Sequence, residues 1–119
     1  MIVFVSASEE DEWTFRRIIG VEHPVVSVRE VAEARTAITK YHPRIVVCDS
    51  DASGAESWRD LLAVPESVSF ALIVVSRHPD ERLWAEVLNL GGYDVLATPL
   101  RRTEVERVMA SALCHAASR

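Results

Sequence analysis

Five short apolar runs, each followed by a segment of helical spacing, constrain this chain more than any other feature. The runs lie at residues 2–5, 24–28, 45–48, 70–75 and 93–97. Uninterrupted apolar runs of this length are typical of parallel strands that helices cover on both faces of a sheet. Short strands that alternate with helices therefore predict an α/β fold, a doubly wound, five-stranded parallel sheet of (βα)5 form.

Capping residues and helix breakers indicate where the helices begin and end. Ser8 opens a capping pattern, and Gly20 ends the helix that follows it. Pro43 stops a helix over residues 30–41, which carries Val31, Ala34, Ile38 and Tyr41 at helical spacing. Pro79 is expected in the first turn of the fourth helix. Every helix is thus bounded by short links, which fits one domain over residues 1–119.

Apolar stripes predict which helix faces lie in the core. The short third helix carries Trp58, Leu61 and Leu62 and ends before Pro65, and the fourth carries Leu83, Val87 and Leu88. The fifth helix has a capping box at Thr103 and Glu106 and a long stripe made of Val105, Val108, Met109, Ala112, Leu113 and Ala116. We also expect Trp13 and Trp58 in the core or at its edge.

Charge and hydropathy exclude several classes of protein. The net charge of −5, with scattered basic residues, argues against direct binding of nucleic acid, which needs a concentrated basic face. No apolar run approaches the ~20 residues of a membrane span, and residues 1–5 are too short for a signal peptide. We therefore expect a cytoplasmic protein without a membrane partner. Cys48 and Cys114 have no metal or redox spacing and are expected to be reduced packing thiols.

Polar residues follow four of the strands at the point where each strand ends. In a doubly wound sheet, ligands bind outside the carboxyl ends of the strands. The residues at these exits are Ser6 and Ala7, then Asp49 and Asp51, then Ser76 and Arg77, and finally Thr98. A functional site is predicted there.

Four segments, in order along the whole chain, carry a resemblance to a known family. PRIVVCD (43–49), LIVVS (72–76), GGYDVLATP (91–99) and EARTAI (33–38) resemble the corresponding segments of bacterial response-regulator receiver domains. The resemblance implies the flavodoxin-like strand order 2-1-3-4-5. It also implies self-phosphorylation of an aspartate, with Mg²⁺, from a histidine kinase or a small phosphodonor.

Carried over by position, the resemblance assigns roles to three residues. Asp49 matches the phosphoacceptor, and Ser76 matches the hydroxyl that binds the phosphoryl group. Asp51 matches the position whose backbone carbonyl helps to hold Mg²⁺, so Asp49 and Asp51 are the metal ligands that remain. Beyond self-phosphorylation and autodephosphorylation at Asp49, no enzymatic activity is implied.

Several positions depart from the family pattern. Ser6 and Ala7 replace the acidic pair that holds Mg²⁺, and Thr98 replaces the lysine. The other departures are Val95 at the aromatic-switch position, Arg77 at a small-residue position and Ser53 at a proline position. Phosphoryl transfer depends on positioning and charge neutralisation, which the metal and the lysine supply. Their combined loss is expected to cost more than ~10⁴ in rate, so Mg²⁺ binding is expected to be weak or absent.

Alternatives remain for the charged residues near Asp49. Asp49 itself is either a strand-end carboxylate hydrogen-bonded to backbone N–H groups or a residual acceptor that a partner reads. Asp51 is expected to be an ordinary loop acid rather than a substitute metal ligand. The acids Glu9 to Asp11 are expected to act as helix-dipole partners rather than to replace the missing acidic pair. Arg77 is either solvated or a substitute cation that reaches over Asp49 and holds the domain in one state.

The leading prediction is a receiver-like signalling domain with a degenerate phosphorylation site, acting through protein–protein contacts in a phosphorelay. The chain is expected to be a stand-alone unit or part of a longer regulator. Trp84 and Tyr93 are candidate interface residues on the face of the fourth helix, fifth strand and fifth helix. The expected partners are a histidine kinase, an output domain or a second copy of the chain.

The alternative is a genuine receiver that is phosphorylated on Asp49. A flavodoxin-like cofactor binder is disfavoured, because SASEEDE (6–12) offers three or more acids and no glycine to a phosphate.

Overall fold

The sheet has the predicted strands and the predicted order. The computed structural model describes residues 1–52, 54–63 and 69–117. Its strands are β1 (Ile2–Val5), β2 (Val25–Val28), β3 (Ile45–Asp49), β4 (Ala71–Ser76) and β5 (Asp94–Ala97). They form one parallel sheet in the order β2-β1-β3-β4-β5. The predicted flavodoxin-like (βα)5 fold is therefore confirmed.

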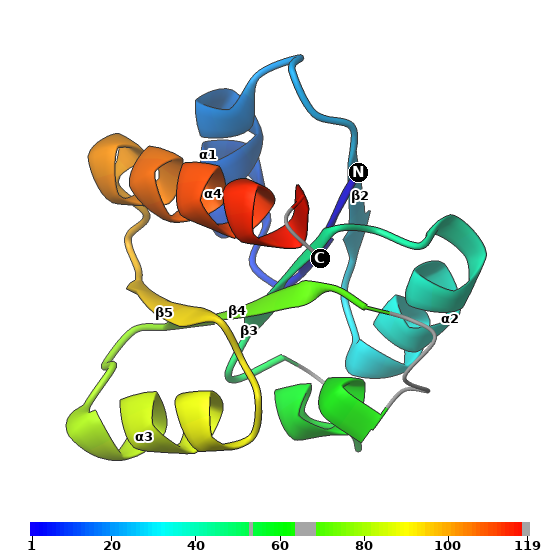
Figure 1. The fold of residues 1–119 in the computed structure, drawn as a ribbon, viewed down its shortest axis with the longest axis vertical. Helices are drawn as coiled ribbons and strands as arrows, with labels where there is room; N and C mark the ends of the chain where they lie inside the picture. Colours follow the sequence, from blue (N-terminus) through cyan, green and yellow to red (C-terminus); the bar gives the residue numbers. More distant parts are fainter. Residues whose placement is uncertain (53, 64–68, 118–119) are drawn as a thin grey trace.

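Helices cover both faces of the sheet. They are α1 (Glu9–Ile19), α2 (Val31–Tyr41), α3 (Glu81–Asn89) and α4 (Arg102–Ala117), and the short helix after β3 is a 3₁₀-helix, η1 (Trp58–Ala63). Figure 1 shows α1 and α4 side by side on one face of the sheet, with α2, η1 and α3 on the other. The inner strands β1, β3 and β4 bury both of their faces, which explains why they read as continuous apolar runs, whereas the edge strand β2 is half-buried along its length.

Successive residues of each strand belong to two separate cores. In β1, Ile2 and Phe4 pack towards α1 and α4, whereas Val3 and Val5 pack towards α2, η1 and α3. Phe4 stacks on Phe15 of α1, with 4.6 Å between the ring centroids. These two apolar layers fix the sheet between its helices, so the carboxyl ends of the strands are held in register.

Most of the predicted helix ends agree with the structure, and two do not. Ser8 is the N-cap of α1 and accepts a hydrogen bond from the Asp11 amide, while Gly20 ends the helix with φ 68°. Pro79 was expected in the first turn of α3, but Asp80 caps that helix by accepting a hydrogen bond from the Leu83 amide. The Asp80 carboxylate satisfies a helix-terminal N–H, so the chain turns helical only after it. Thr103 lies inside the first turn of α4, which begins at Arg102.

Three side chains that the apolar patterns assign to the core are exposed. Trp13 has 60% of its surface exposed, and Tyr41 and Leu88 are exposed at 42% and 47%. Each lies on the outward side of a helix, beyond the arc that reaches the sheet. Trp58, in contrast, is buried. Ser53, Pro65 and the Ala116 side chain fall outside what the structure describes. No described helix has the length and apolar character needed to cross a bilayer.

Candidate functional site

The predicted site residues gather at the carboxyl edge of the sheet. The Ser6 amide donates to the Val28 carbonyl at 3.0 Å, and the Thr98 amide donates to the Ser76 carbonyl at 2.9 Å. These bonds extend the strand ladders beyond the strand ends, so the segments after β1 and β5 leave the sheet in a fixed direction. Asp49 is the last residue of β3, between these two exits.

Both carboxylate oxygens of Asp49 accept hydrogen bonds from nearby groups. The Ser6 hydroxyl donates to Oδ2 at 3.3 Å, and the Asp51 amide donates to Oδ1 at 2.9 Å. The second bond closes the turn that follows β3, as an aspartate commonly does two residues before a backbone N–H. The strand-end arrangement with a backbone N–H partner is therefore present at Asp49.

Ser6 stands at the first position of the family's acidic pair, and its side chain is buried. Its hydroxyl oxygen accepts a hydrogen bond from the Ser8 amide at 3.0 Å while its proton goes to Asp49. Ser8 in turn caps α1. The Ser6 hydroxyl thus connects the N-terminus of α1 to the β3 carboxylate by hydrogen bonds, without adding a charge.

Ser76 and Arg77, at the end of β4, differ in burial. Ser76 is buried, and its hydroxyl oxygen accepts a hydrogen bond from the His78 amide at 3.2 Å. Arg77 is exposed. Its positive charge lies near enough to α1 to lower the pKa of Asp11. The role of Arg77 as a substitute cation for Asp49 stays a prediction.

Asp11 is the residue that sequence reasoning did not place at the site. Partial burial, followed by the nearby Asp49 carboxylate, raises the pKa of Asp11. The Ser8 hydroxyl and Arg77 act in the opposite direction, and Glu10 raises it slightly more. A signal was available in the sequence, because the first turn of a helix that follows a parallel strand lies at the same edge as the strand exits.

Two single substitutions are expected to move the pKa of Asp11 in opposite directions. Asp49→Asn removes a neighbouring negative charge and lowers the pKa of Asp11, whereas Arg77→Ala removes a cation and raises it. A carboxyl-detected NMR titration of the folded protein measures both shifts. Because the pKa of Asp11 is raised in the folded state, its contribution to stability falls as the pH rises above the ordinary aspartate pKa of 3.8. Movement of both shifts in one direction would contradict this placement of Arg77.

The position of the family's acidic pair offers Mg²⁺ no carboxylate. The ion prefers several hard oxygen ligands, with carboxylates to offset its charge. At the position of the acidic pair the chain offers a hydroxyl that donates its proton to Asp49, and Asp51 is exposed in the loop. Among the described residues, no group of three His, Cys, Asp or Glu side chains is placed to hold a metal ion.

The remaining family positions carry neutral side chains. Thr98 stands at the lysine position directly after β5, and the peptide bond between Thr98 and Pro99 is cis. Val95 stands at the aromatic-switch position and is buried in the core under α3. No aromatic ring at this position can therefore swing between a buried and an exposed rotamer.

The candidate interface residues lie on two neighbouring elements. Trp84 is 43% exposed on α3, and the exposed Leu88 lies one turn further along the same helix. Tyr93 precedes β5 and is half-buried, and its hydroxyl shares a hydrogen bond with the Ser111 hydroxyl of α4. The ring of Tyr93 also lies 5.2 Å from that of His115. Trp84 and Leu88 thus form an exposed apolar strip on α3.

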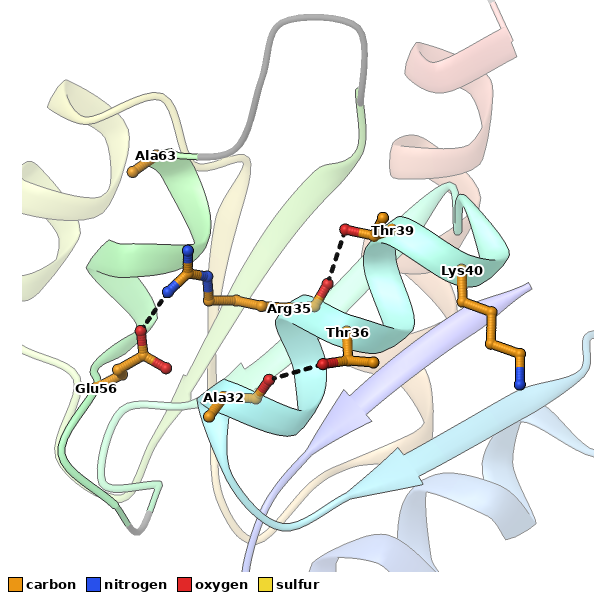
Figure 2. Close-up of a pocket in the computed structure, with 7 residues that line it drawn as sticks. All are labelled: Ala32, Arg35, Thr36, Thr39, Lys40, Glu56 and Ala63. Atoms are coloured by element: carbon orange, nitrogen blue, oxygen red, sulfur yellow. Dashed lines mark hydrogen bonds and ion pairs between the residues drawn. The ribbon is translucent and has the colours of Figure 1, made fainter.

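The depression between α2 and η1 lies apart from the strand exits. Figure 2 shows Arg35 reaching across it to form an ion pair with Glu56. The hydroxyls of Thr36 and Thr39 donate to carbonyls one turn back in α2, namely those of Ala32 and Arg35. The polar groups that line the depression are therefore largely occupied by one another.

The two cysteines lie in different environments. Cys48 is fully buried in β3, and burial, followed by the adjacent Asp49 carboxylate, raises the pKa of its thiol to about 12. Cys114 is exposed on α4. Both are free thiols, and Cys48 packs in the core as predicted, whereas the prediction of a packing role for Cys114 is wrong because its place on α4 faces solvent.

Several solved receiver domains have the same fold as this chain. No protein-family model matches the chain, and no curated protein matches its sequence. The signal receiver domain assigned to a Luxo repressor protein from Vibrio parahaemolyticus superposes with a TM-score of 0.87 at 18% identity, covering 97% of this chain and 90% of that one. A receiver domain of an HD domain-containing protein from Pseudomonas fluorescens gives 0.86 at 20% identity, with 99% and 97% covered.

A third comparison includes an activated state. The BeF3-activated N-terminal receiver domain of RstA from Klebsiella pneumoniae gives a TM-score of 0.81 at 18% identity, with 94% of this chain and 97% of that chain covered. At these identities the similarity establishes the fold. This chain therefore has the fold of a response-regulator receiver domain over almost its entire length.

Proposed function

We propose that this chain is a receiver-like signalling domain of a two-component system whose phosphorylation site is degenerate, and that it acts through protein–protein contacts. It is not an enzyme in this proposal, apart from any residual self-phosphorylation at Asp49. Its partners are a histidine kinase, an output domain or a second copy, engaged through α3, β5 and α4. We place it in the cytoplasm, where two-component receivers meet their kinases.

The hydrogen bond from Ser6 to Asp49 is the observation that carries this proposal. A hydroxyl stands where a metal-binding carboxylate is needed, and its proton occupies one oxygen of the acceptor. The Asp51 amide occupies the other oxygen. The neutral Thr98 side chain offers no charge to a transferred phosphoryl group. Nucleophilic attack by Asp49 would then start from oxygens that already accept hydrogen bonds, without a metal or a lysine to neutralise the transferred group.

The proposal predicts no saturable response to a phosphoryl mimic. In the presence of millimolar Mg²⁺, beryllofluoride or acetyl phosphate should leave the amide resonances around Asp49 and Ser76 unchanged. The measurement is a ¹H–¹⁵N NMR titration of the wild-type protein. Asp49→Asn is the control, because any change that persists in this variant does not arise at the acceptor.

A saturable shift that disappears in Asp49→Asn would support the alternative function, a genuine receiver phosphorylated on Asp49. Two observations favour this alternative. Ser76 keeps a buried hydroxyl at the end of β4, and Asp11 brings a second carboxylate to the edge where Asp49 lies. The titration separates the two functions, because only the alternative needs Asp49 to respond.

A further inference from the structure

The helix α3 is held to the sheet by few buried side chains. Val87 is its one fully buried residue, and Leu83 is partly buried. Gly92, just beyond the helix, allows a close approach, since a β-carbon there would lie 2.5 Å from Val87 Cγ1. The outward side carries Trp84 and Leu88. A nine-residue helix with one buried anchor is expected to open more readily than the rest of the fold.

One ion pair joins this helix to η1. Arg59 Nε lies 2.5 Å from Glu86 Oε2, and Arg59 Nη2 lies 2.6 Å from Glu86 Oε1. This is the two-pronged guanidinium–carboxylate geometry, which fixes orientation as well as distance. The paired Arg59 guanidinium holds the pKa of Glu86 below its ordinary value, with a smaller contribution from Arg82.

The η1 end of this ion pair has a rigid base. The guanidinium of Arg59 lies 4.7 Å from the ring centroid of Trp58, which is buried. The Ser57 amide donates to the Asp60 carboxylate at 2.8 Å, and the Asp60 amide donates back to the Ser57 carbonyl at 2.9 Å. Arg59 therefore extends from an anchored turn, so it loses little conformational freedom when it binds Glu86.

We infer that Arg59, supported by Trp58, clamps α3 through Glu86 and holds the exposed Trp84–Leu88 strip in one orientation. Val95 supplies no aromatic ring to couple α3 to the acceptor. Besides the apolar core that α3 shares with Trp58 and Leu61, the Arg59–Glu86 pair gives α3 a directional polar connection to the segment that follows β3. Figure 1 shows η1 and α3 as neighbours on the same face of the sheet. The clamp does not depend on whether Asp49 accepts a phosphoryl group. A negative result for the clamp would therefore leave the proposed function unaffected, and the reverse also holds.

Native-state hydrogen exchange of the whole chain tests the clamp. Glu86→Gln and Arg59→Gln should each accelerate exchange of the α3 amides by about two- to fivefold, the range expected for a surface ion pair. Amides of β4 and α2 should change less than the α3 amides. In the double variant the two effects should not add. The reversed pair, Arg59→Glu with Glu86→Arg, should recover at least part of the wild-type protection.

Glu56→Gln is the matched control, because it breaks another exposed Arg–Glu pair, between Arg35 and the segment before η1. It should leave α3 exchange at the wild-type rate. High salt should accelerate α3 exchange in the wild type and not in Glu86→Gln. Unchanged α3 exchange in both single variants would overturn the clamp. Equal acceleration in α2, β4 and α3 would also overturn it, because that pattern reports a global loss of stability.

Discussion

Replacing Ser6 and Ala7 by aspartate and Thr98 by lysine is expected to turn this domain into one that accepts a phosphoryl group in the presence of Mg²⁺. The triple variant Ser6→Asp, Ala7→Asp, Thr98→Lys restores two carboxylates for the metal and one cation for the phosphoryl oxygens. It also removes the hydroxyl that donates to Asp49. The initial rate of phosphorylation by acetyl phosphate should rise by about 10⁴-fold or more, the factor that the combined loss of these groups is expected to cost.

The individual changes should not add, because metal and lysine act on the same transferred group. Thr98→Lys alone should have little effect on the rate, whereas the two aspartates should supply Mg²⁺ binding without fast transfer. Without metal, a carboxylate at the buried Ser6 position repels Asp49, so the triple variant should melt at a lower temperature and recover when Mg²⁺ is added. Asp49→Asn in the same background must abolish phosphorylation. If the triple variant binds Mg²⁺ and still accepts no phosphoryl group, these three positions are not the cause of the degeneracy.

Trp58→Ala and Trp13→Ala are expected to have very different effects on stability. Trp58 is 1% exposed and fills the core beneath α2 and α3, so its truncation leaves a cavity and should cost about 3–5 kcal/mol. This is a large part of the stability of an ordinary domain. Trp13 is 60% exposed, and its main described contact is the Arg17 guanidinium 4.7 Å above its ring. Its truncation should cost no more than about 1 kcal/mol.

Urea unfolding followed by circular dichroism measures both values on one scale. Each variant is the other's control for the loss of an indole ring. The midpoint should fall sharply for Trp58→Ala and hardly at all for Trp13→Ala, with similar slopes. Similar midpoints for the two variants would contradict the burial that separates them.

The two tryptophans also show why apolar patterns predict strands better than helix faces. A strand covered on both sides buries every residue, so an uninterrupted run such as 71–76 needs no choice of face. On α1, Trp13 lies about 200° around the helix from the buried Phe15, at 100° per residue. Its aromatic character suggested the core, whereas its angle places it outside. Leu88 belongs to the apolar stripe predicted for α3. In the structure α3 fully buries only Val87 of that stripe, so Leu88 stays exposed.

The site divides in a similar way. The strand exits are set by topology, so Ser6, Asp49, Ser76 and Thr98 were placed at one edge from the sequence alone. The hydrogen bond from Ser6 to Asp49 depends on side-chain rotamers and on the exact turn after β1, which no pattern encodes. The influence of Asp11 on this edge depends on the angle at which α1 leaves the sheet. The Arg59–Glu86 pair joins residues 27 apart that no periodicity relates.

The low reactivity of Cys48 has a practical consequence for site-specific labelling of this protein. Only a minute fraction of its buried thiol is ionised near neutral pH, because its pKa is raised to about 12. Thiol-directed reagents will therefore leave Cys48 unmodified and react with Cys114, which is exposed on α4. The natural sequence thus carries a single addressable attachment point for a fluorophore or a spin label, on one of the elements proposed to meet a partner, and no cysteine needs to be removed first.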